Sequence, residues 1–403
     1  MSSQIVTVAG IGADGWQGLS PLSQNAIRQA AVIAGGPRQL ALLPDALPAR
    51  RVPLPSPLLP GLPGLIAEHA SAALVVLASG DPMFYGIGAT LVRLLGPDKV
   101  RVFPHLSSVS LAAARLGWAL DDVDVVSLVG RPRELLHPLL QPGRRVLALT
   151  AESSAAADIR ALLDARGFGG SPVTVLADLG GPDEVAAPAD GRPHSSLAII
   201  AIDCRLDATA AARYLPRTPG LPDEAFENDG QLTKREIRAL TLAALAPVPG
   251  QLLWDVGAGS GSIGIEWMRV HPASRAIAIE PNETRRARIA RNAAALGVPG
   301  LSLVNGAAPE ALAGLPAPDA VFIGGGVTVL GVVDACAAAL GPGGRLVANA
   351  VTLEGQAVLA DWRQRLGGTL TRIGVERAES LGPHTIWRPA LPVVQWATVK
   401  ENQ

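Results

Sequence analysis

The sequence has little cysteine and no excess charge of either sign. Cys204 and Cys336 are its cysteines, and each lies in an apolar context typical of a buried thiol. Two cysteines provide neither a disulfide framework nor metal-site spacing, and they suit a reducing cytoplasm. The formal net charge is −1 over 403 residues, without long runs of like charge. This balance disfavours nucleic acid and anionic membranes as partners.

Long hydrophobic runs are also missing. No apolar stretch approaches the roughly 18 residues that span a bilayer, although 48% of the residues are hydrophobic. Residues 1–12 have no basic region and pass directly into a strand-like run, which is not typical of a signal peptide. We therefore expect a globular, cytoplasmic protein with sizeable cores and no membrane anchor.

Short β-branched runs alternate with alanine-rich helical stretches, which predicts α/β domains with mainly parallel sheets. In the first half the predicted strands are Ile5–Ala9, Val32–Ala34, Leu74–Ala78, Val100–Phe103, Val125–Leu128, Arg145–Leu149, Val173–Leu176 and Leu197–Ile202. In the second half we predict a helix, five strands and a late antiparallel strand, at Lys234–Leu245, Leu252–Val256, Arg275–Ile279, Leu301–Val304, Ala320–Ile323, Arg345–Ala348 and Val393–Val399. This second order is that of a doubly wound, Rossmann-like domain.

Two breaks interrupt the alternation. Residues 213–230 contain three prolines and several acids without periodicity, which predicts a linker over 211–230 between domains at 1–210 and 231–403. A weaker break at Pro104–Ser107 divides the first domain into lobes at about 1–104 and 105–210. A cleft between two lobes is a common place for a ligand.

A glycine-rich turn stands between an apolar strand and a helix in the second half. Gly257, Gly259 and Gly261 allow backbone N–H groups at a helix start to approach a ligand. Ser262 occupies the place of the third glycine in a dinucleotide fingerprint, so the strict NAD pattern fails. Glu280 ends a strand about 20 residues further on, where a carboxylate can accept both ribose hydroxyls. Together they predict an adenosine site; the alternative is a tight turn without a ligand.

The surrounding segments are TKRE, LLWDVGAGSGSIGIE, AIAIEPN, VNGAAPEAL, PDAVFIGGG and PGGRLVANAVTLE, in this order. They resemble the precorrin methyltransferases that methylate C15 of a corrin precursor and decarboxylate its ring C acetate, over nearly all of 231–403. The resemblance implies S-adenosylmethionine contacts at Thr233, Gly257, Ala258, Gly259, Ser260, Gly261, Glu280 and Ala308. The glycines of Phe322–Gly326, at a strand's carboxyl end, would admit a flat macrocycle; the alternative is a mobile loop.

A second glycine turn, VLASGDPMFYGIG, lies at residues 76–88. Pro82 rigidifies it, and Asp81 can cap the following helix. With VTVAGIGADGWQGLS, FPHLSSVSLAAARLGW and VVSLVGRP, it resembles the tetrapyrrole methylases over residues 1–205, in particular the precorrin subfamily that methylates C5. That family has two α/β lobes with S-adenosylmethionine between them. The resemblance places near the cofactor, or at the lobe junction, the residues Gly80, Asp81, Met83, Tyr85, Gly86, Ser107 and Ser108.

Two segments depart from that family's pattern. Residues 104–106 are Pro-His-Leu where the family usually has a proline–glycine turn, and residues 12–15 lack its usual glycine–proline–glycine. His105 is therefore a candidate for contact with substrate, although a lone loop histidine is more often structural. We assign Asp14 no catalytic role from the sequence.

The implied chemistry needs few catalytic side chains. A sulfonium methyl is already activated, and the macrocycle itself accepts the electrons of a departing carboxylate, so alignment and exclusion of water are the main requirements. A polycarboxylate substrate needs cations, for which His384 and Arg388 are candidates; His384 is a possible proton donor or a plain loop residue. Asn349 and Glu354 are candidates for substrate contact, with helix capping as the alternative.

Both halves together resemble the fused precorrin-6Y methyltransferases of aerobic cobalamin biosynthesis. This implies methylation at C5 and C15 with decarboxylation of the ring C (C12) acetate to give precorrin-8, two S-adenosylmethionine sites and no metal. It also implies a homo-oligomer, possibly a tetramer, formed through residues 231–403. Two alternatives stay open. One is a nicotinamide-dependent reductase, which Ser262 disfavours. The other is a non-catalytic tetrapyrrole-binding scaffold with one degenerate half.

Overall fold

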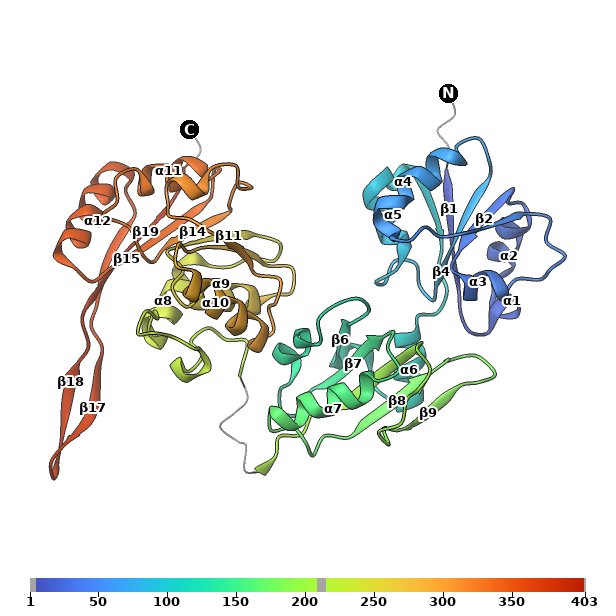
Figure 1. The fold of residues 1–403 in the computed structure, drawn as a ribbon, viewed down its shortest axis with the longest axis horizontal. Helices are drawn as coiled ribbons and strands as arrows, with labels where there is room; N and C mark the ends of the chain where they lie inside the picture. The colour runs from blue at the N-terminus through green and yellow to red at the C-terminus, as the bar shows by residue number, and fades with distance from the viewer. Residues whose placement is uncertain (1–4, 209–214, 402–403) are drawn as a thin grey trace. The chain divides into compact units, whose positions relative to one another are not determined.

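The computed structural model describes residues 5–208 and 215–401, and the chain divides into two compact units (Figure 1). Unit 1 comprises Met1–Arg131 and Gln141–Tyr214, and unit 2 comprises Pro132–Leu140 and Leu215–Gln403. Residues 211–214 of the predicted linker lie outside the described residues.

The first lobe of unit 1 is a parallel sheet in the order β3-β2-β4-β1-β5. Its strands are β1 (Val6–Ile11), β2 (Val32–Gly35), β3 (Arg50–Pro53), β4 (Leu74–Ser79) and β5 (Val100–Phe103). One face is covered by α4 (Leu58–Glu68) and α5 (Ile87–Leu95), and the other by α1 (Gly15–Gly18), α2 (Pro21–Arg28) and α3 (Pro37–Ala41). Because helices cover both faces, β1 and β4 are buried on both sides, which explains their apolar sequences.

The second lobe has the strand order β6-β7-β10-β8-β9. Its elements are β6 (Val123–Ser127), β7 (Arg145–Thr150), β8 (Val173–Ala177), β9 (Val185–Pro188), β10 (Ala198–Asp203), α6 (Ser108–Leu116) and α7 (Ala155–Ala165). Only the β6–β7 pair is parallel, so the expectation of mainly parallel sheets is wrong for this lobe. The connection from β8 to β9 is too short for a helical crossover, and these two strands pair antiparallel.

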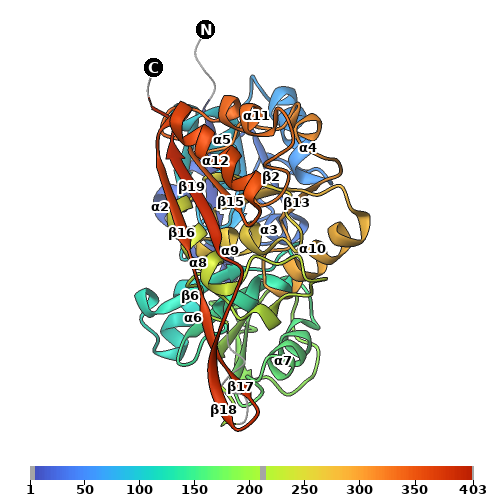
Figure 2. The same ribbon diagram turned by 90° about the vertical axis from the view of Figure 1, so that its left-hand side faces the viewer.

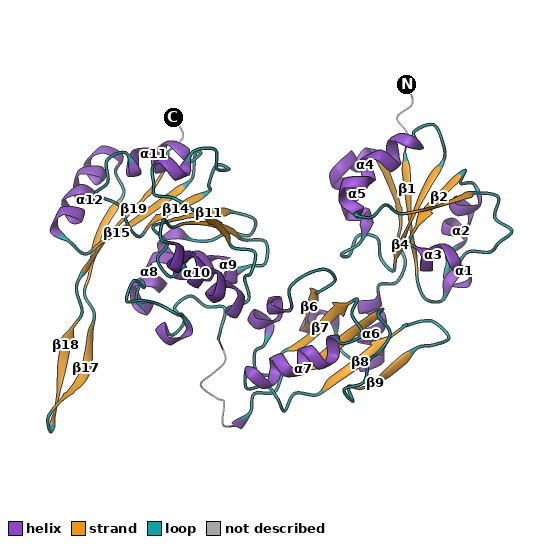
Figure 3. Ribbon diagram, in the orientation of Figure 1, coloured by secondary structure: helices purple, strands orange, loops and turns teal. Residues whose placement is uncertain are grey.

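Unit 2 contains a seven-stranded sheet in the order β13-β12-β11-β14-β15-β19-β16 (Figure 3). Its strands are β11 (Leu252–Val256), β12 (Arg275–Ile279), β13 (Ser302–Val304), β14 (Ala320–Ile323), β15 (Arg345–Ala350), β16 (Thr369–Ile373) and β19 (Val393–Val399). Five strands run parallel, and β19 is antiparallel to both of its neighbours, as predicted for the late strand. This is the expected doubly wound arrangement.

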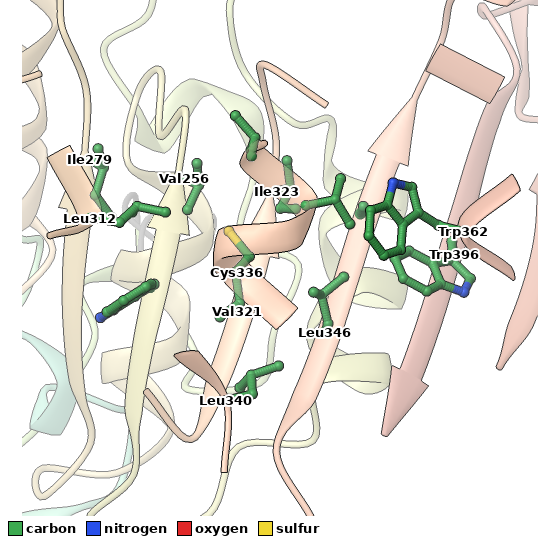
Figure 4. Close-up of a cluster of buried hydrophobic side chains, with 14 of the residues drawn as sticks. Val256, Ile279, Leu312, Val321, Ile323, Cys336, Leu340, Leu346, Trp362 and Trp396 are labelled. Carbon is green, nitrogen blue, oxygen red and sulfur yellow. The ribbon is translucent and has the colours of Figure 1, made fainter. Parts of the chain in front are cut away.

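Helices cover both faces of this sheet. They are α8 (Arg235–Leu245), α9 (Ser262–Val270), α10 (Glu283–Ala295), α11 (Val332–Ala339) and α12 (Leu353–Leu366). Residues of α11 and α12 pack on one face, and residues of α8, α9 and α10 on the other. Figure 4 shows Trp362 and Trp396 next to each other in the first of these cores, with ring centroids 6.4 Å apart.

Each strand predicted from the sequence has a counterpart, with ends that differ by at most two residues. The predictions missed β3, β9 and β16, as well as the hairpin of β17 (Glu376–Leu381) and β18 (His384–Pro389). The hairpin extends away from the sheet of unit 2 (Figures 1 and 2). Every residue of β17 is exposed, so the strand lacks the alternation of apolar and polar residues that identifies strands in a sequence.

Cys204 and Cys336 are buried free thiols, and burial raises the pKa of each to about 12. In residues 5–208 and 215–401 the helices are too short or too polar to cross a membrane. The same residues contain no cluster of three His, Cys, Asp or Glu side chains suited to a metal ion.

Candidate functional site

Unit 2 contains a cavity of about 490 Å³ beside the glycine turn that follows β11. Gly257 has φ +69°, and an added Cβ would lie 2.8 Å from the backbone N and Cα of Gly325. The turn after β11 therefore packs backbone to backbone against the turn after β14. Gly324 lines the cavity as well, so two glycine turns at the carboxyl ends of adjacent parallel strands form one wall.

Glu280 supports the glycine turn at the end of β12. Its side chain is buried, Oε2 accepts a hydrogen bond from Gly259 N–H at 2.9 Å, and Oε1 accepts one from Asn282 N–H at 3.1 Å. Each carboxylate oxygen retains a further lone pair, so the group can still accept hydroxyl donors. Glu280 and the glycine turn, two separate features of the sequence, are therefore hydrogen-bonded to each other.

Half of the cofactor residues predicted for unit 2 line the cavity. Of these predicted residues, Thr233, Gly257, Ala258 and Gly259 line the cavity. The others stand outside its lining: Ser260, Gly261, Glu280 and Ala308. Glu280 and Ser260 hydrogen-bond residues of the lining, Gly259 and Gln231 respectively.

The last residue of the predicted linker and the residue after it form another wall of this cavity. Gly230 and Gln231 line it, and Gln231 C=O accepts a hydrogen bond from Ser260 Oγ at 2.7 Å. Asn292 of α10 donates from Nδ2 to Glu227 O at 2.9 Å and to Ser260 O at 3.0 Å. Residues 215–230 are thus part of unit 2, because their backbone polar groups bond to its helices and loops. The proline-rich composition masked this, since prolines also suit ordered extended segments.

Two arginines of α10 pair with the carboxylate of Asp229, which directly precedes Gly230 of this wall. Asp229 Oδ2 lies 3.0 Å from Arg285 Nε and 3.1 Å from Arg288 Nη1, and Arg285 holds the pKa of Asp229 well below its usual range. The groups are partly exposed, so salt screens the interaction.

We expect Asp229→Asn to weaken S-adenosylmethionine binding at this site roughly two- to fivefold, with the difference shrinking at high salt. Calorimetric titration at low and high ionic strength measures this. Asp334→Asn, which removes an exposed ion pair with Arg365 on α12, is the matched control and should leave binding unchanged. A defect of equal size at high salt would contradict an electrostatic origin.

Asp255 lies in β11 directly before the glycine turn and is 1% exposed. Burial raises its pKa, the hydrogen bond from Gly264 N–H at 2.9 Å lowers it, and the nearby Glu280 carboxylate raises it, which together bring the pKa to about 7. Among the described residues, Oδ1 has no hydrogen-bond partner. The folded protein therefore keeps a proton on Asp255 at pH values where an exposed aspartate has lost it.

This pKa predicts a pH dependence of stability. Because the folded pKa, about 7, lies above the ordinary value of 3.8, the folded state binds more protons between these values. The resulting stabilisation is complete below the lower value and is lost as the pH rises through the upper one. Asp255→Asn cannot ionise, so we expect its unfolding free energy to fall less than that of the wild type between about pH 5 and about pH 8. Urea unfolding at both pH values measures this, and identical pH slopes would contradict it.

Asn349 lies in β15 and lines the cavity, where its amide is fixed by two buried polar side chains. Its Nδ2 donates to Thr241 Oγ1 at 2.9 Å, and its Oδ1 accepts from Gln395 Nε2 at 3.1 Å. The capping alternative is wrong for Asn349, since the N-cap of α12 is Thr352. Glu354 lies exposed in the first turn of α12, where its charge favours the helix dipole, and outside the cavity lining.

His384 and Arg388 lie on β18 of the exposed hairpin and outside the cavity lining given by the described residues. Arg388 Nε pairs with Glu379 Oε2 across the hairpin at 2.7 Å. The cations that line the cavity are Lys234 and Arg377, neither of which the sequence singled out. Arg377 lies in β17 and pairs with Glu236 at 2.5 Å. The sequence could have pointed to Arg377 only if the hairpin of β17 and β18 had been predicted.

Unit 1 contains its own cavity of about 370 Å³, lined by residues of both lobes. The predicted residues that line it are Gly80, Asp81, Tyr85, Gly86, Ser107 and Ser108. Met83, 46% exposed, lies outside this lining. The cavity stands at the carboxyl ends of β1 and β4, where parallel strands commonly position ligands.

The second glycine turn differs from its predicted form in one hydrogen bond. Asp81 Oδ1 accepts from Met83 N–H at 2.8 Å, and the N-cap of α5 is Gly86, so Asp81 does not cap the helix. Tyr85 has φ +54°, an uncommon conformation for a residue with a side chain, and its ring lies under the Arg131 guanidinium. Ser107 caps α6 by accepting a hydrogen bond from Ser110 N–H at 3.0 Å.

Comparisons with known proteins match each half of the chain separately. A family model of tetrapyrrole (corrin/porphyrin) methylases matches residues 6–190, and one of the precorrin methyltransferase domain matches residues 224–400. The C-terminal domain of precorrin-6Y C5,15-methyltransferase from Rhodobacter capsulatus is 47% identical in sequence; the match covers 46% of this chain and 100% of that domain, with a TM-score of 0.44.

Curated relatives also match over nearly the whole length. The precorrin-6Y C(5,15)-methyltransferase [decarboxylating] of a Sinorhizobium species is 50% identical over 98% of this chain and 96% of its own. The protein of the same name from Mycobacterium tuberculosis (strain CDC 1551 / Oshkosh) is 48% identical over 98% of this chain and 100% of its own.

Proposed function

Since the chain belongs to the family of decarboxylating precorrin-6Y C5,15-methyltransferases, we propose that it carries two S-adenosylmethionine sites, one in each unit. The cavity of unit 1 serves methylation of precorrin-6Y at C5. The cavity of unit 2 serves methylation at C15 with loss of the ring C acetate carboxyl group, which gives precorrin-8. The observation that carries this proposal is that each unit has its own glycine-turn cavity, and each cavity falls within a different family match.

The residues of unit 2 fit this cofactor. A cavity of about 490 Å³ is in the range of small-molecule sites, and a side chain at Gly257 would close the glycine turn on Gly325. The turn would hold the cofactor by its backbone, with Glu280 accepting ribose hydroxyls and Thr233, which lines the same cavity, contacting the cofactor. S-adenosylmethionine supplies an activated methyl group, so the protein's task is to align the acceptor carbon and to exclude water.

A substrate with several carboxylates requires cations at the cavity. Lys234 and Arg377 line it and can pair with substrate carboxylates. Asn349, held by Thr241 and Gln395, presents a fixed amide to the same space. We propose these three for substrate binding; proton donation by His384 and contacts from Arg388 and Glu354 stay predictions. During decarboxylation the conjugated ring takes up the electrons of the breaking bond.

Binding stoichiometry tests the proposal. We expect two equivalents of S-adenosylmethionine per whole chain in a calorimetric titration, and one equivalent would favour the scaffold alternative with a degenerate half. Titration with a reduced nicotinamide should leave the nucleotide fluorescence unchanged. A saturable change would favour the reductase alternative.

We also propose that the chain forms a homo-oligomer, with a tetramer expected, through residues 231–403, and that it acts in the cytoplasm in the aerobic route to cobalamin. The exposed hairpin of unit 2 supports an assembly role, since Leu381 and Trp387 are 56% and 69% exposed. Native mass spectrometry of the whole chain should show four copies, and a monomer at micromolar concentration would contradict this.

A further inference from the structure

The two segments of unit 1 that depart from the tetrapyrrole methylase pattern meet in the structure. Asp14 follows β1, and His105 lies between β5 and α6. His105 Nε2 is 3.2 Å from Asp14 Oδ1. Because β1 and β5 are adjacent parallel strands, the loops at their carboxyl ends lie at the same edge of the sheet.

The ordinary structural role does not account for Asp14. An aspartate directly before a helix usually accepts a hydrogen bond from that helix's first turn. Asp14 is the N-cap residue of α1, yet its side chain makes no capping hydrogen bond. Its carboxylate is directed to His105 instead, and the His105 side chain is only 11% exposed.

Two glycines leave the room that this pair occupies. A Cβ at Gly12 would lie 2.6 Å from Asp14 Oδ1 and 2.7 Å from His105 Nε2. A Cβ at Gly18 would overlap the Asp14 carboxylate. A side chain at either position would displace the pair, so the local sequence accommodates this carboxylate and imidazole specifically.

The pair adjoins the cavity of unit 1. Gly12 and Ala13, which precede Asp14, line the cavity, and so does Leu106, which follows His105. Within the described residues, the hydrogen bonding of the His105 side chain is confined to the Asp14 contact, which leaves Nδ1 available. The facing groups are the Asp14 carboxylate and the uncharged backbone of Gly10 and Gly12.

We propose that His105 is the base that accepts the proton displaced when unit 1 methylates its substrate, and that Asp14 is a positioning residue. This inference rests on the proposed function. The Asp14 carboxylate accepts the Nε2 hydrogen, which fixes the tautomer with a lone pair on Nδ1 and stabilises the imidazolium that forms.

Methyl transfer and the following proton loss require no reactant besides the substrate and S-adenosylmethionine. The ring carbon uses a π electron pair to form the new C–C bond, and the S–CH₃ bond breaks with its electrons left on sulfur. The cationic ring then loses the hydrogen of that carbon to His105 Nδ1, and the electrons of the C–H bond restore the conjugated system. The imidazolium releases its proton to water.

The test uses the whole chain, precorrin-6Y substrate and ¹³C-methyl S-adenosylmethionine, with methylation at C5 and C15 resolved by NMR. We expect His105→Ala to lower kcat for C5 methylation about 10²- to 10³-fold while the affinity for S-adenosylmethionine stays unchanged. Free imidazole in the buffer should restore part of the C5 rate. Asp14→Asn should lower kcat in the wild type but have no further effect in His105→Ala.

Gly86→Val is the matched control, because its side chain would meet the backbone of Pro82 and close the cradle without removing the base. It should lose C5 methylation and show no rescue by imidazole. An unchanged C5 rate in His105→Ala, or a loss that imidazole does not restore, would overturn the role of His105. A loss confined to C15 methylation would instead overturn the assignment of C5 to unit 1.

Discussion

Gly257→Val abolishes methylation at C15 and carbon dioxide release, and it removes one of two S-adenosylmethionine equivalents per chain. This is the expected result because Gly257 has φ +69° and its Cβ would lie 2.8 Å from the backbone of Gly325. Neither turn can yield without moving a strand end, so the side chain opens the cradle or displaces the cofactor. Calorimetric titration and trapping of labelled carbon dioxide measure both effects.

Gly341→Ala is the control for this variant. Gly341 is also in unit 2, but an added Cβ would meet no atom within 4 Å. It should bind two equivalents and release carbon dioxide at the wild-type rate. Retention of two equivalents and of carbon dioxide release by Gly257→Val would show that the cofactor site of unit 2 lies elsewhere.

We expect Arg238→Met to destabilise unit 2 by about 3–5 kcal/mol, because it leaves the Glu266 carboxylate buried without its cation. Arg238 is 0% and Glu266 2% exposed, and their Nε and Oε1 atoms are 2.6 Å apart. Arg238 also donates to Thr233 O at 2.6 Å, so the same change loosens the cavity wall. Urea unfolding followed by tryptophan emission reports mainly on unit 2, which contains five of the seven tryptophans: Trp254, Trp267, Trp362, Trp387 and Trp396.

Two further variants test whether the loss of stability comes from an unpaired buried charge. Arg238→Met combined with Glu266→Met should recover part of the loss, since no unpaired charge remains; recovery is partial because Glu266 also accepts from Gly220 N–H and Leu221 N–H. Arg388→Met breaks an exposed pair and should change stability by less than about 1 kcal/mol. Equal losses for Arg238→Met and Arg388→Met would contradict the importance of burial.

Local sequence patterns predicted the parts of the fold and of the cradles that depend on local geometry. The turn at Gly257 to Gly261 needs glycine for its positive φ angles, and Glu280 ends a buried strand that is plain from its apolar run. Strands such as β11 and β14 are buried on both faces, which leaves an unmistakable apolar signal.

The other features of the candidate sites depend on contacts between residues that are distant in the sequence. Gln231 C=O accepts a hydrogen bond from Ser260, and Glu227 C=O accepts one from Asn292. Both donors are distant in the chain, and the prolines and acids around Glu227 have the composition of a linker. Arg377 stands on a hairpin whose first strand is wholly exposed, so periodicity could not reveal it. The meeting of Asp14 and His105 requires the order of strands in the sheet, which local patterns do not specify.

The most direct test of two separate methyl-transfer sites is complementation between two cradle variants. Gly86→Val inactivates the site of unit 1 and Gly257→Val that of unit 2, as their backbone contacts require. Each variant and an equal mixture are incubated with precorrin-6Y and ¹³C-methyl S-adenosylmethionine, and the products are resolved by mass and NMR. We expect the mixture to form the doubly methylated, decarboxylated product, whichever site acts first. Neither variant alone should form it. Formation of that product by either variant alone, or an inactive mixture of folded variants, would contradict the account.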